Sequence, residues 1–239
     1  MKNAIPKIIH QVWSGVDEPL PKFFKVLGET WKEQHPAWSY EFWDNDRMNS
    51  FVKTEYPEYW NAYNSYPYNV QRWDAIRYLI LDKTGGMYVD FDYESLEPLD
   101  NLLEGKTCCF ALEPQSHCDI FKRKLMFNNA LMACVPNHPF MKKIVEQVFS
   151  DEVVGYRDVS KWACVLKTTG PWRLIDLYEQ ATEEEKASVY LIPDKYVTPF
   201  DVNQARQLRI GMETEELENC LQEAVAVHYF FNSWTIDNK

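Results

Sequence analysis

The run from residue 69 to residue 92 constrains the fold of this chain more than any other stretch. Apolar residues recur at the 3.6-residue period across residues 69–83, which predicts a helix. Gly85 and Gly86 then predict a Schellman-type end to that helix. The apolar segment 87–90 follows directly and predicts a short buried strand that ends on an acidic residue. A helix, a glycine turn and a strand in immediate succession are typical of an α/β protein.

The rest of the chain fits that class. Phe23, Leu27 and Trp31 recur at helical spacing, and residues 46–68 predict a helical segment interrupted by prolines. Further strands are expected at 7–13, 39–43, 108–112, 129–134, 189–192 and 225–230, and further helices at 139–149 and 172–180. The early strand–helix–strand order predicts a mainly parallel central sheet flanked by helices. No stretch has the composition of a linker, so we expect one domain over residues 1–239.

Charge and hydropathy exclude several classes of function. The formal net charge is −11, because 36 Asp and Glu outnumber 25 Lys and Arg. A protein this acidic is not expected to bind nucleic acid, although one basic pocket for a phosphorylated ligand remains compatible. No stretch approaches the roughly 18 apolar residues of a spanning helix, and residues 1–6 lack the apolar run of a signal peptide. We therefore expect a cytoplasmic protein and leave open a peripheral contact with the inner face of the membrane.

The six cysteines predict neither structural disulfide bonds nor a metal centre. None lies in a C-x-x-C pair, and no Cys/His pair has zinc-finger spacing. A chain of 239 residues with 46% hydrophobic residues can bury a large core without cross-links. Reduced and mostly buried thiols are the expectation.

Asp90 and Asp92 form a D-x-D pair just after the apolar strand. If the strand continues through residue 92, both side chains point to one face, roughly 6–7 Å apart along the chain. Two carboxylates at that spacing can reach one hard divalent cation, and ligands of open α/β sheets bind at the carboxyl ends of strands. The bare motif is equally a solvated acidic turn. A phosphatase signature would require Thr or Val where this chain has Glu94.

Asp74 and Arg77 lie three residues apart and so share one face of the predicted helix. On an exposed helix such a pair is a weak ion pair. The helix ends a few residues before the Asp90 strand, so its polar face can instead line the same cleft and bind the hydroxyls of a sugar.

Three segments together resemble the DXD-containing sugar transferases of glycosyltransferase family 32. They are IPKIIHQVW at 5–13, WDAIRYLIL at 73–81 and GGMYVDFD at 85–92. That family includes yeast initiating mannosyltransferases and bacterial capsular-polysaccharide enzymes, and its core resembles that of the clostridial glucosylating toxins. The resemblance covers the first half of the chain well and the second half loosely.

The resemblance implies a GT-A fold, a nucleoside-diphosphate sugar as donor (UDP- or GDP-linked), a Mn²⁺ or Mg²⁺ ion and a retaining transfer. Carried onto this chain, it places Trp13 against the nucleotide base. Asp74 and Arg77 match the residues that hold the donor sugar. Asp90 and Asp92 match the motif that engages metal, diphosphate and ribose. Those two pairs of residues are the predicted catalytic set.

The closing segment HYFFNSW at 228–234 resembles the family's C-terminal motif. There Ser233 and Trp234 would approach the diphosphate and the metal, and we expect this tail to close over the donor. His228 is either a further metal or phosphate contact or a hydrogen-bonded core residue. The resemblance thus divides the chain into a donor-binding part over about 1–112 and an acceptor and closing part over about 113–239.

Other positions in these motifs carry weaker expectations. Gln11 and Tyr88 lie inside the matched segments and are included in the predicted donor site. Trp73 stands where the family usually has a small residue, so it either narrows the donor site or packs inward. Asn129, with Asn128 before it, could present an amide to the acceptor or occupy a turn.

The predicted function is transfer of a hexose to a glycan or lipid-linked glycan hydroxyl, in polysaccharide biosynthesis such as capsule assembly by analogy with the family. The predicted partners are the donor and this acceptor. A second possibility is a non-catalytic nucleotide-sugar or carbohydrate-binding protein on the same fold. A third, a glycoside hydrolase using Asp90 and Asp92, fits less well because hydrolases place their carboxylates on either side of the bond.

Overall fold

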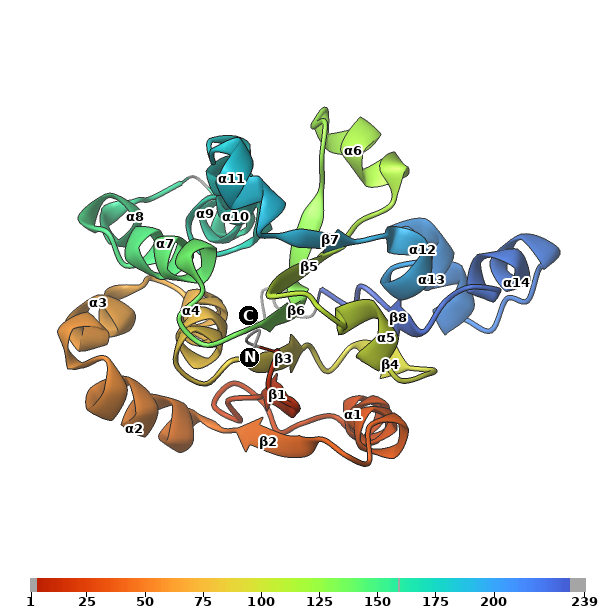
Figure 1. Ribbon diagram of the computed structural model, residues 1–239, viewed down its shortest axis with the longest axis horizontal. Helices are drawn as coiled ribbons and strands as arrows, with labels where there is room; N and C mark the ends of the chain where they lie inside the picture. The colour runs from red at the N-terminus through yellow and green to blue at the C-terminus, as the bar shows by residue number, and fades with distance from the viewer. Residues whose placement is uncertain (1–3, 159, 233–239) are drawn as a thin grey trace.

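A computed structural model of the chain describes residues 4–158 and 160–232 (Figure 1). Its centre is a six-stranded sheet in the order β2-β1-β3-β6-β5-β7. The strands are β1 Ile8–Val12, β2 Ser39–Trp43, β3 Gly86–Val89, β5 Cys108–Leu112, β6 Phe127–Cys134 and β7 Tyr190–Ile192. Only β6 runs against its neighbours; the other pairings are parallel. This confirms the predicted mainly parallel sheet, which takes strands from both the earlier and the later half of the chain.

Helices cover the two faces of the sheet (Figure 1). Their bounds are α1 Lys22–Gln34, α2 Asn45–Glu55, α3 Trp60–Ser65, α4 Asn69–Thr84, α5 Asp100–Leu103, α6 Gln115–Phe121, α7 Pro139–Val148, α8 Asp151–Gly155, α9 Lys161–Thr168, α10 Pro171–Glu179, α11 Glu183–Ala187, α12 Asp194–Val197, α13 Val202–Arg209 and α14 Glu215–Leu221, with a 3₁₀ turn at Pro57–Tyr59. None of the helices in the described part of the chain is long and apolar enough to cross a bilayer. The predicted elements are present within a few residues, but the short helices α5, α6, α8, α9, α12, α13 and α14 were not predicted.

The sheet is buried on both faces, as expected for mainly parallel strands. Tyr88 packs into a cluster with Ile76 of α4 on one side, and Met87 packs into a second cluster with Trp31 of α1 on the other. The helix α4 contacts β3 and β6 and also α2, α3, α7 and α9. The helix α4 is therefore enclosed on nearly all sides, which explains why its own apolar residues lie on nearly every face.

The junction between α4 and β3 depends on close backbone approach. Gly85 has φ +63° and ψ −160°, so the predicted left-handed Schellman cap is wrong. A Cβ atom at Gly85 would lie 2.6 Å from Cδ of Pro136, and one at Gly86 would lie 2.6 Å from the carbonyl oxygen of Ile8. The glycines are thus required because α4, β3 and the neighbouring strands leave no room for a side chain.

The strand that carries the D-x-D pair ends earlier than predicted. β3 stops at Val89, and the Tyr93 amide donates to the carbonyl of Asp90 at 3.2 Å, which closes a turn. Asp90 and Asp92 therefore do not share one strand face, and the same-face expectation is wrong. Between the two aspartates, Phe91 is buried and packs in a cluster with Phe24.

After the turn the chain forms a second, two-stranded sheet. β4 Tyr93–Ser95 pairs antiparallel with β8 Ala226–His228, with Tyr93 opposite His228. This pairing brings the C-terminal segment beside the D-x-D turn. It also shortens the strand predicted at 225–230 to three residues.

Candidate active site

A cavity of about 970 Å³ lies at the ends of β1 and β3, where the parallel strands deliver the residues that follow them. Its volume matches that of pockets for nucleotide-sized ligands. The polar groups in its wall include Asp74, Arg77, Asp90, Asp92, Asn129 and His228. All four residues of the predicted catalytic set therefore face one cavity.

Arg77 is the centre of this polar wall. Its Nη2 lies 3.2 Å from Oδ1 of Asp90 and 3.5 Å from Oδ1 of Asp74. Its Nη1 donates to Oδ2 of Asp90 at 3.3 Å and to the carbonyl of Asn129 at 3.1 Å. The guanidinium carbon sits 4.8 Å from the ring centre of Tyr88. The pair predicted from helix spacing is thus a buried network that spans α4, β3 and β6.

Asp74 is held by two residues that are distant in sequence. Asn129 Nδ2 donates to Asp74 Oδ1 at 3.0 Å, and Thr169 Oγ1 donates to Asp74 Oδ2 at 3.0 Å. Burial raises the pKa of Asp74 above its ordinary value, and Arg77 and these two hydrogen bonds oppose that shift. Asn129 lies on β6 and not in a turn, so the turn interpretation is wrong. Thr169 carried no signal in the sequence, because its role depends on a contact 95 positions away.

Asp90 is buried, and its neighbours shift its pKa in opposite directions. Burial raises its pKa to about 6; the Arg77 charge lowers it, and the negative charge of Asp92 raises it further. The Tyr88 hydroxyl donates to Asp90 Oδ1. Tyr88 itself is fully buried and is not among the residues that line the cavity. Its predicted donor contact is therefore corrected: Tyr88 orients Asp90 from behind.

Asp92 lies in the turn between β3 and β4 and is bound to the C-terminal segment. Its Oδ1 lies 3.4 Å from Nε2 of His228, and its Oδ2 accepts from the Phe231 amide at 3.0 Å. Its backbone carbonyl accepts from the amide of Tyr229 at 2.9 Å. Burial raises the pKa of Asp92, but attraction to His228 and these hydrogen bonds outweigh burial and hold it below its ordinary value. Asp92 thus ties the closing segment to the cavity.

The side chains that could ligate a metal in this cavity fit a hard divalent cation in part. Asp90 and Asp92 present carboxylate oxygens, the ligands that Mg²⁺ and Mn²⁺ prefer. The repulsion of Asp92 on Asp90 is the kind that a bound cation relieves. The atom Nδ1 of His228 is buried without a hydrogen-bond partner among the described residues. However, these three side chains do not form a compact cluster of the size that one ion requires.

Such a compact cluster does exist elsewhere, where none was expected. Within the described ranges, Cys108, Cys134 and His138 have ligand atoms within 4.8 Å of one another. His138 Nδ1 already accepts from the Phe140 amide at 3.2 Å, and all three residues are buried and outside the cavity wall. One nitrogen of the imidazole is therefore committed to capping α7. Each of the six cysteines is a free thiol and five are buried, as predicted.

Trp13 follows β1 and lines the cavity. Its indole nitrogen donates to the carbonyl of Glu18 at 3.0 Å, and its ring meets Phe24 and Phe91 edge-on, at centroid distances of 5.6 and 6.2 Å. These contacts hold a large aromatic side chain at the cavity wall. Gln11, in contrast, is fully buried beneath the site and accepts from the Tyr40 hydroxyl at 2.7 Å. The structure therefore places Gln11 away from the cavity.

Trp73 both packs inward and narrows the cavity, the two alternatives that the sequence left open. It packs against the core cluster of α4 and also lines the cavity. It therefore narrows the cavity while it packs inward. Ser233 and Trp234, the remaining members of the predicted donor site, lie outside the described residues.

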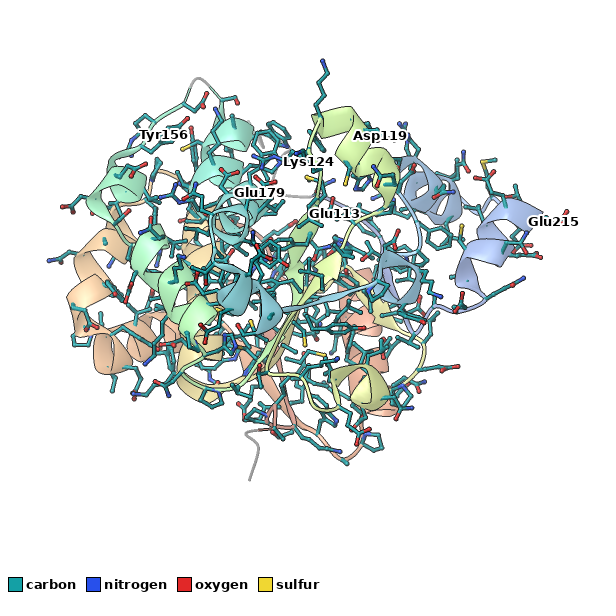
Figure 2. All side chains as sticks on the ribbon, turned by 45° about the horizontal axis from the view of Figure 1, so that its top comes forward. Glu113, Asp119, Lys124, Tyr156, Glu179 and Glu215 are labelled. Atoms are coloured by element: carbon teal, nitrogen blue, oxygen red, sulfur yellow. The ribbon has the colours of Figure 1, made fainter. Side chains whose placement is uncertain are left out.

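Glu113 and His117 form a further pair in the cavity wall. His117 Nε2 accepts from the Val202 amide at 3.1 Å, so the proton sits on Nδ1, which donates to Glu113 Oε2 at 2.8 Å. Figure 2 shows Glu113 where the strand β5 leads into α6. Sequence reasoning missed His117, although its spacing of four residues from Glu113 is a usable signal.

The cavity and its carboxylates can be compared with known proteins. Residues 21–109 match the family described as the glycosyltransferase sugar-binding region containing the DXD motif. An inositol phosphoceramide mannosyltransferase of Schizosaccharomyces pombe is 30% identical over 173 residues, which cover 71% of this chain and 50% of that protein. A mannosyl phosphorylinositol ceramide synthase of Saccharomyces cerevisiae is 30% identical over 178 residues, or 74% and 43%. The chain spans about half the length of these relatives or less.

A glycosyltransferase of Acanthamoeba polyphaga mimivirus is 30% identical over 203 residues, which cover 83% of this chain and 74% of that protein. Two solved structures show the same fold at low identity. The ligand-free glycosyltransferase domain of the YGT toxin has a TM-score of 0.56 at 11% identity, over 91% of this chain and 90% of that one. The PaToxG glycosyltransferase has a TM-score of 0.52 at 16% identity, over 92% and 84%. The fold is therefore GT-A, and the chain belongs to the DXD-containing glycosyltransferases of family 32.

Proposed function

We propose that this protein transfers a hexose, with retention, from a nucleoside-diphosphate sugar to a hydroxyl of a glycan or lipid-linked glycan. The observation that carries the proposal is the buried Asp74–Arg77–Asp90 network, which shares one cavity with Asp92 and Trp13. A divalent ion, Mn²⁺ or Mg²⁺, would be held by Asp90 and Asp92. When bound, it supplies positive charge to the diphosphate leaving group.

The residues of the chain have separate tasks in this proposal. Arg77 favours the ionised form of two buried carboxylates and fixes their positions, which prepares the site before the donor arrives. Asp74 is held from three sides and can accept hydrogen bonds from sugar hydroxyls with its remaining lone pairs. Trp13 offers an aromatic face to the nucleobase; stacking of this kind is worth about 1–3 kcal/mol per base in nucleic-acid systems.

Mannose is the proposed hexose. Two of the relatives described above have names that specify mannosyl transfer, to inositol phosphoceramide in one case. Those relatives are longer than this chain, so the identity of the acceptor is a separate question. A GDP-linked donor and a UDP-linked donor are both compatible with a wall that presents Trp13 and carboxylates.

The first test is a thermal-shift panel of UDP, GDP, CDP and their common sugars, each with and without Mn²⁺. A ligand at about 100 times its Kd stabilises the folded state by roughly 2.7 kcal/mol, which raises Tm by several degrees. We expect a rise for one nucleotide that requires the metal and disappears in Asp92→Asn. Asp151→Asn, an exposed aspartate outside the cavity, is the matched control. A metal-dependent rise that survives in Asp92→Asn would contradict the metal assignment.

Turnover separates the enzyme from a binding protein on the same fold. We expect Asp92→Asn to lose at least about 100-fold in donor turnover, the scale of removing one group that stabilises transition-state charge. Donor binding without hydrolysis or transfer would instead identify a non-catalytic relative. Cleavage of an aryl glycoside without metal would favour a hydrolase.

Trp13→Ala tests the base site separately. If the indole stacks on the base in both the ground state and the transition state, its loss raises the KM for the donor more than it lowers kcat. A fall in kcat at constant KM would remove Trp13 from the base site. Phe42→Ala, a partly exposed aromatic residue of β2 outside the cavity wall, is the control.

A further inference from the structure

The hairpin between β5 and β6 exposes apolar side chains beside the cavity. Figure 1 shows α6 at the end of a long projection from the sheet, and Figure 2 shows Asp119 and Lys124 on its two limbs. Ile120 is 62% exposed and Phe121 is 37% exposed. Contiguous exposed apolar side chains mark an interaction surface when they form part of a larger patch.

Trp162 of α9 extends this apolar surface. It is 38% exposed and stacks on Phe121 at a centroid distance of 6.1 Å. Trp172, at the start of α10, meets both rings edge-on at 5.0 and 5.6 Å. We call Ile120, Phe121 and Trp162 the apolar rim. The aromatic contacts join the hairpin to α9 and α10, so the rim is one continuous surface.

The rim is bordered by positive charge. Lys122 and Lys124 are exposed on the loop after α6, and neither forms an ion pair with a residue that the structure describes. Arg123 between them is neutralised by Asp176 at 2.7 Å. The hairpin between β5 and β6 carries two acidic residues, Asp119 and Glu113, and Glu113 lines the cavity. Lys122 and Lys124 therefore make only the loop at residues 122–124 locally positive, in a chain whose net charge is −11.

The rim also forms part of the cavity wall. Ile120, Phe121 and Trp162 line the same cavity as Asp74 and Asp92. Whatever covers the rim therefore lies over the route into the active site. Ile120, the most exposed of the three side chains, has no hydrogen-bonding group to offer a sugar hydroxyl.

We propose that the apolar rim and its two lysines dock on the interface of an anionic lipid bilayer, which presents the acceptor to the cavity from the membrane surface. Aromatic side chains favour the headgroup region, and lysines are attracted to the negative surface potential. Apolar insertion and basic charge are the two signals that reversible membrane binding requires. The link to an acceptor rests on the proposed function; the docking itself does not.

The test is flotation of the purified protein with vesicles of phosphatidylcholine alone and with about 30% phosphatidylglycerol. We expect binding only to the anionic vesicles, weakened by added salt. Lys122→Gln with Lys124→Gln should lower the partition coefficient roughly 30-fold, since each lysine near an anionic surface contributes about a factor of five. Ile120→Asn should lower it about fivefold through lost insertion.

Matched controls are available on other surfaces. Lys53→Gln with Lys142→Gln removes the same charge from exposed positions on α2 and α7, and Ile210→Asn changes an isoleucine that is 71% exposed outside the cavity wall. These variants should bind vesicles as the wild type does. Equal losses in the controls, or binding that is indifferent to phosphatidylglycerol, would overturn the proposal. So would a wild-type dimer in solution that Ile120→Asn dissociates, because a second copy would then cover the rim.

Failure of this inference can be separated from failure of the proposed function. Lys122 and Lys124 lie outside the cavity wall, so the metal-dependent nucleotide shift should persist in the variant that lacks both. Nucleotide binding without vesicle binding would remove the membrane inference alone. Vesicle binding without any nucleotide-dependent rise in Tm would support the docking surface and contradict the proposed transferase function.

Discussion

The two walls of the cavity are built on opposite principles. The wall formed by α4 and β3 buries charge: Asp74 is 4% exposed and Arg77 is 9% exposed, and both are held by several partners. A second part of the wall, formed by α6 and α9, exposes apolar side chains such as Ile120 at 62%. The first wall is fixed by hydrogen bonds and ion pairs between buried groups. The second is fixed by contacts between aromatic rings and leaves apolar surface exposed.

The largest effect is expected where the buried wall loses its cation. Arg77→Leu leaves Asp74 and Asp90 as buried charges with reduced compensation, which costs about 3–5 kcal/mol of unfolding free energy. Urea denaturation followed by circular dichroism measures this loss. Arg77→Lys keeps the positive charge but loses the bidentate guanidinium, so its unfolding free energy should lie between those of the wild type and Arg77→Leu. A loss below about 1 kcal/mol for Arg77→Leu would show that the network is not structural, and the contrast between the walls would disappear.

A pH effect should follow from His10, which supports the buried wall from β1. Its Nε2 donates to the Gly85 carbonyl at 3.0 Å, and its Nδ1 accepts from the indole of Trp43 at 3.2 Å. Burial lowers the pKa of His10 to about 4, against about 6.5 when unfolded. Between those values the unfolded state binds more protons, so stability is full above pH 6.5 and falls toward pH 4, by about 3 kcal/mol at most.

Urea titrations at pH 7 and pH 4.5 check this prediction. His35 and His138 also have pKa values lowered by burial, so the wild-type slope contains their contributions. The difference between the wild type and His10→Gln isolates the part due to His10. An identical dependence on pH in the two proteins would contradict the assignment.

A smaller effect is expected where the buried wall loses one hydrogen bond. Thr169→Val removes the hydroxyl that donates to Asp74 Oδ2 and should cost about 1–3 kcal/mol, the range for hydrogen bonds to charged groups. Thr54→Val, at an exposed position of α2, is the matched control and should be near neutral. Denaturation midpoints of the two variants provide the comparison. Equal midpoints would indicate that Asn129 and Arg77 suffice to hold Asp74.

The smallest effect on stability is expected in the exposed wall. Ile120→Ala shortens a side chain that is 62% exposed, so little buried area is lost and the change should cost no more than about 1 kcal/mol. Trp31→Ala, at a fully buried tryptophan, should cost about 3–5 kcal/mol in the same assay. A comparable loss in both variants would mean that the rim is part of the core, and would blur the difference between the walls.

The secondary structure around the active site could be predicted from sequence because its signals are local. The helix over residues 69–84 and the strand after the glycines follow from periodicity within a few turns. Asp74 and Arg77 were placed on one helix face by spacing alone, and the structure joins them to Asp90. The turn at Asp90 was missed, because hydrophobic periodicity indicates that a strand exists but not where it ends.

The sequence by itself determined the fold class, the helix and strand that carry the carboxylates, and the motif that marks the family. Only the tertiary structure decided which distant residues complete the site: Asn129 and Thr169 on Asp74, and the Phe231 amide on Asp92. It also decided that Gln11 and Tyr88 lie behind the cavity. The reason is that periodicity and turns are set by neighbours along the chain, whereas burial and hydrogen-bond partners depend on sheet order and register. Those are properties of the whole packed molecule.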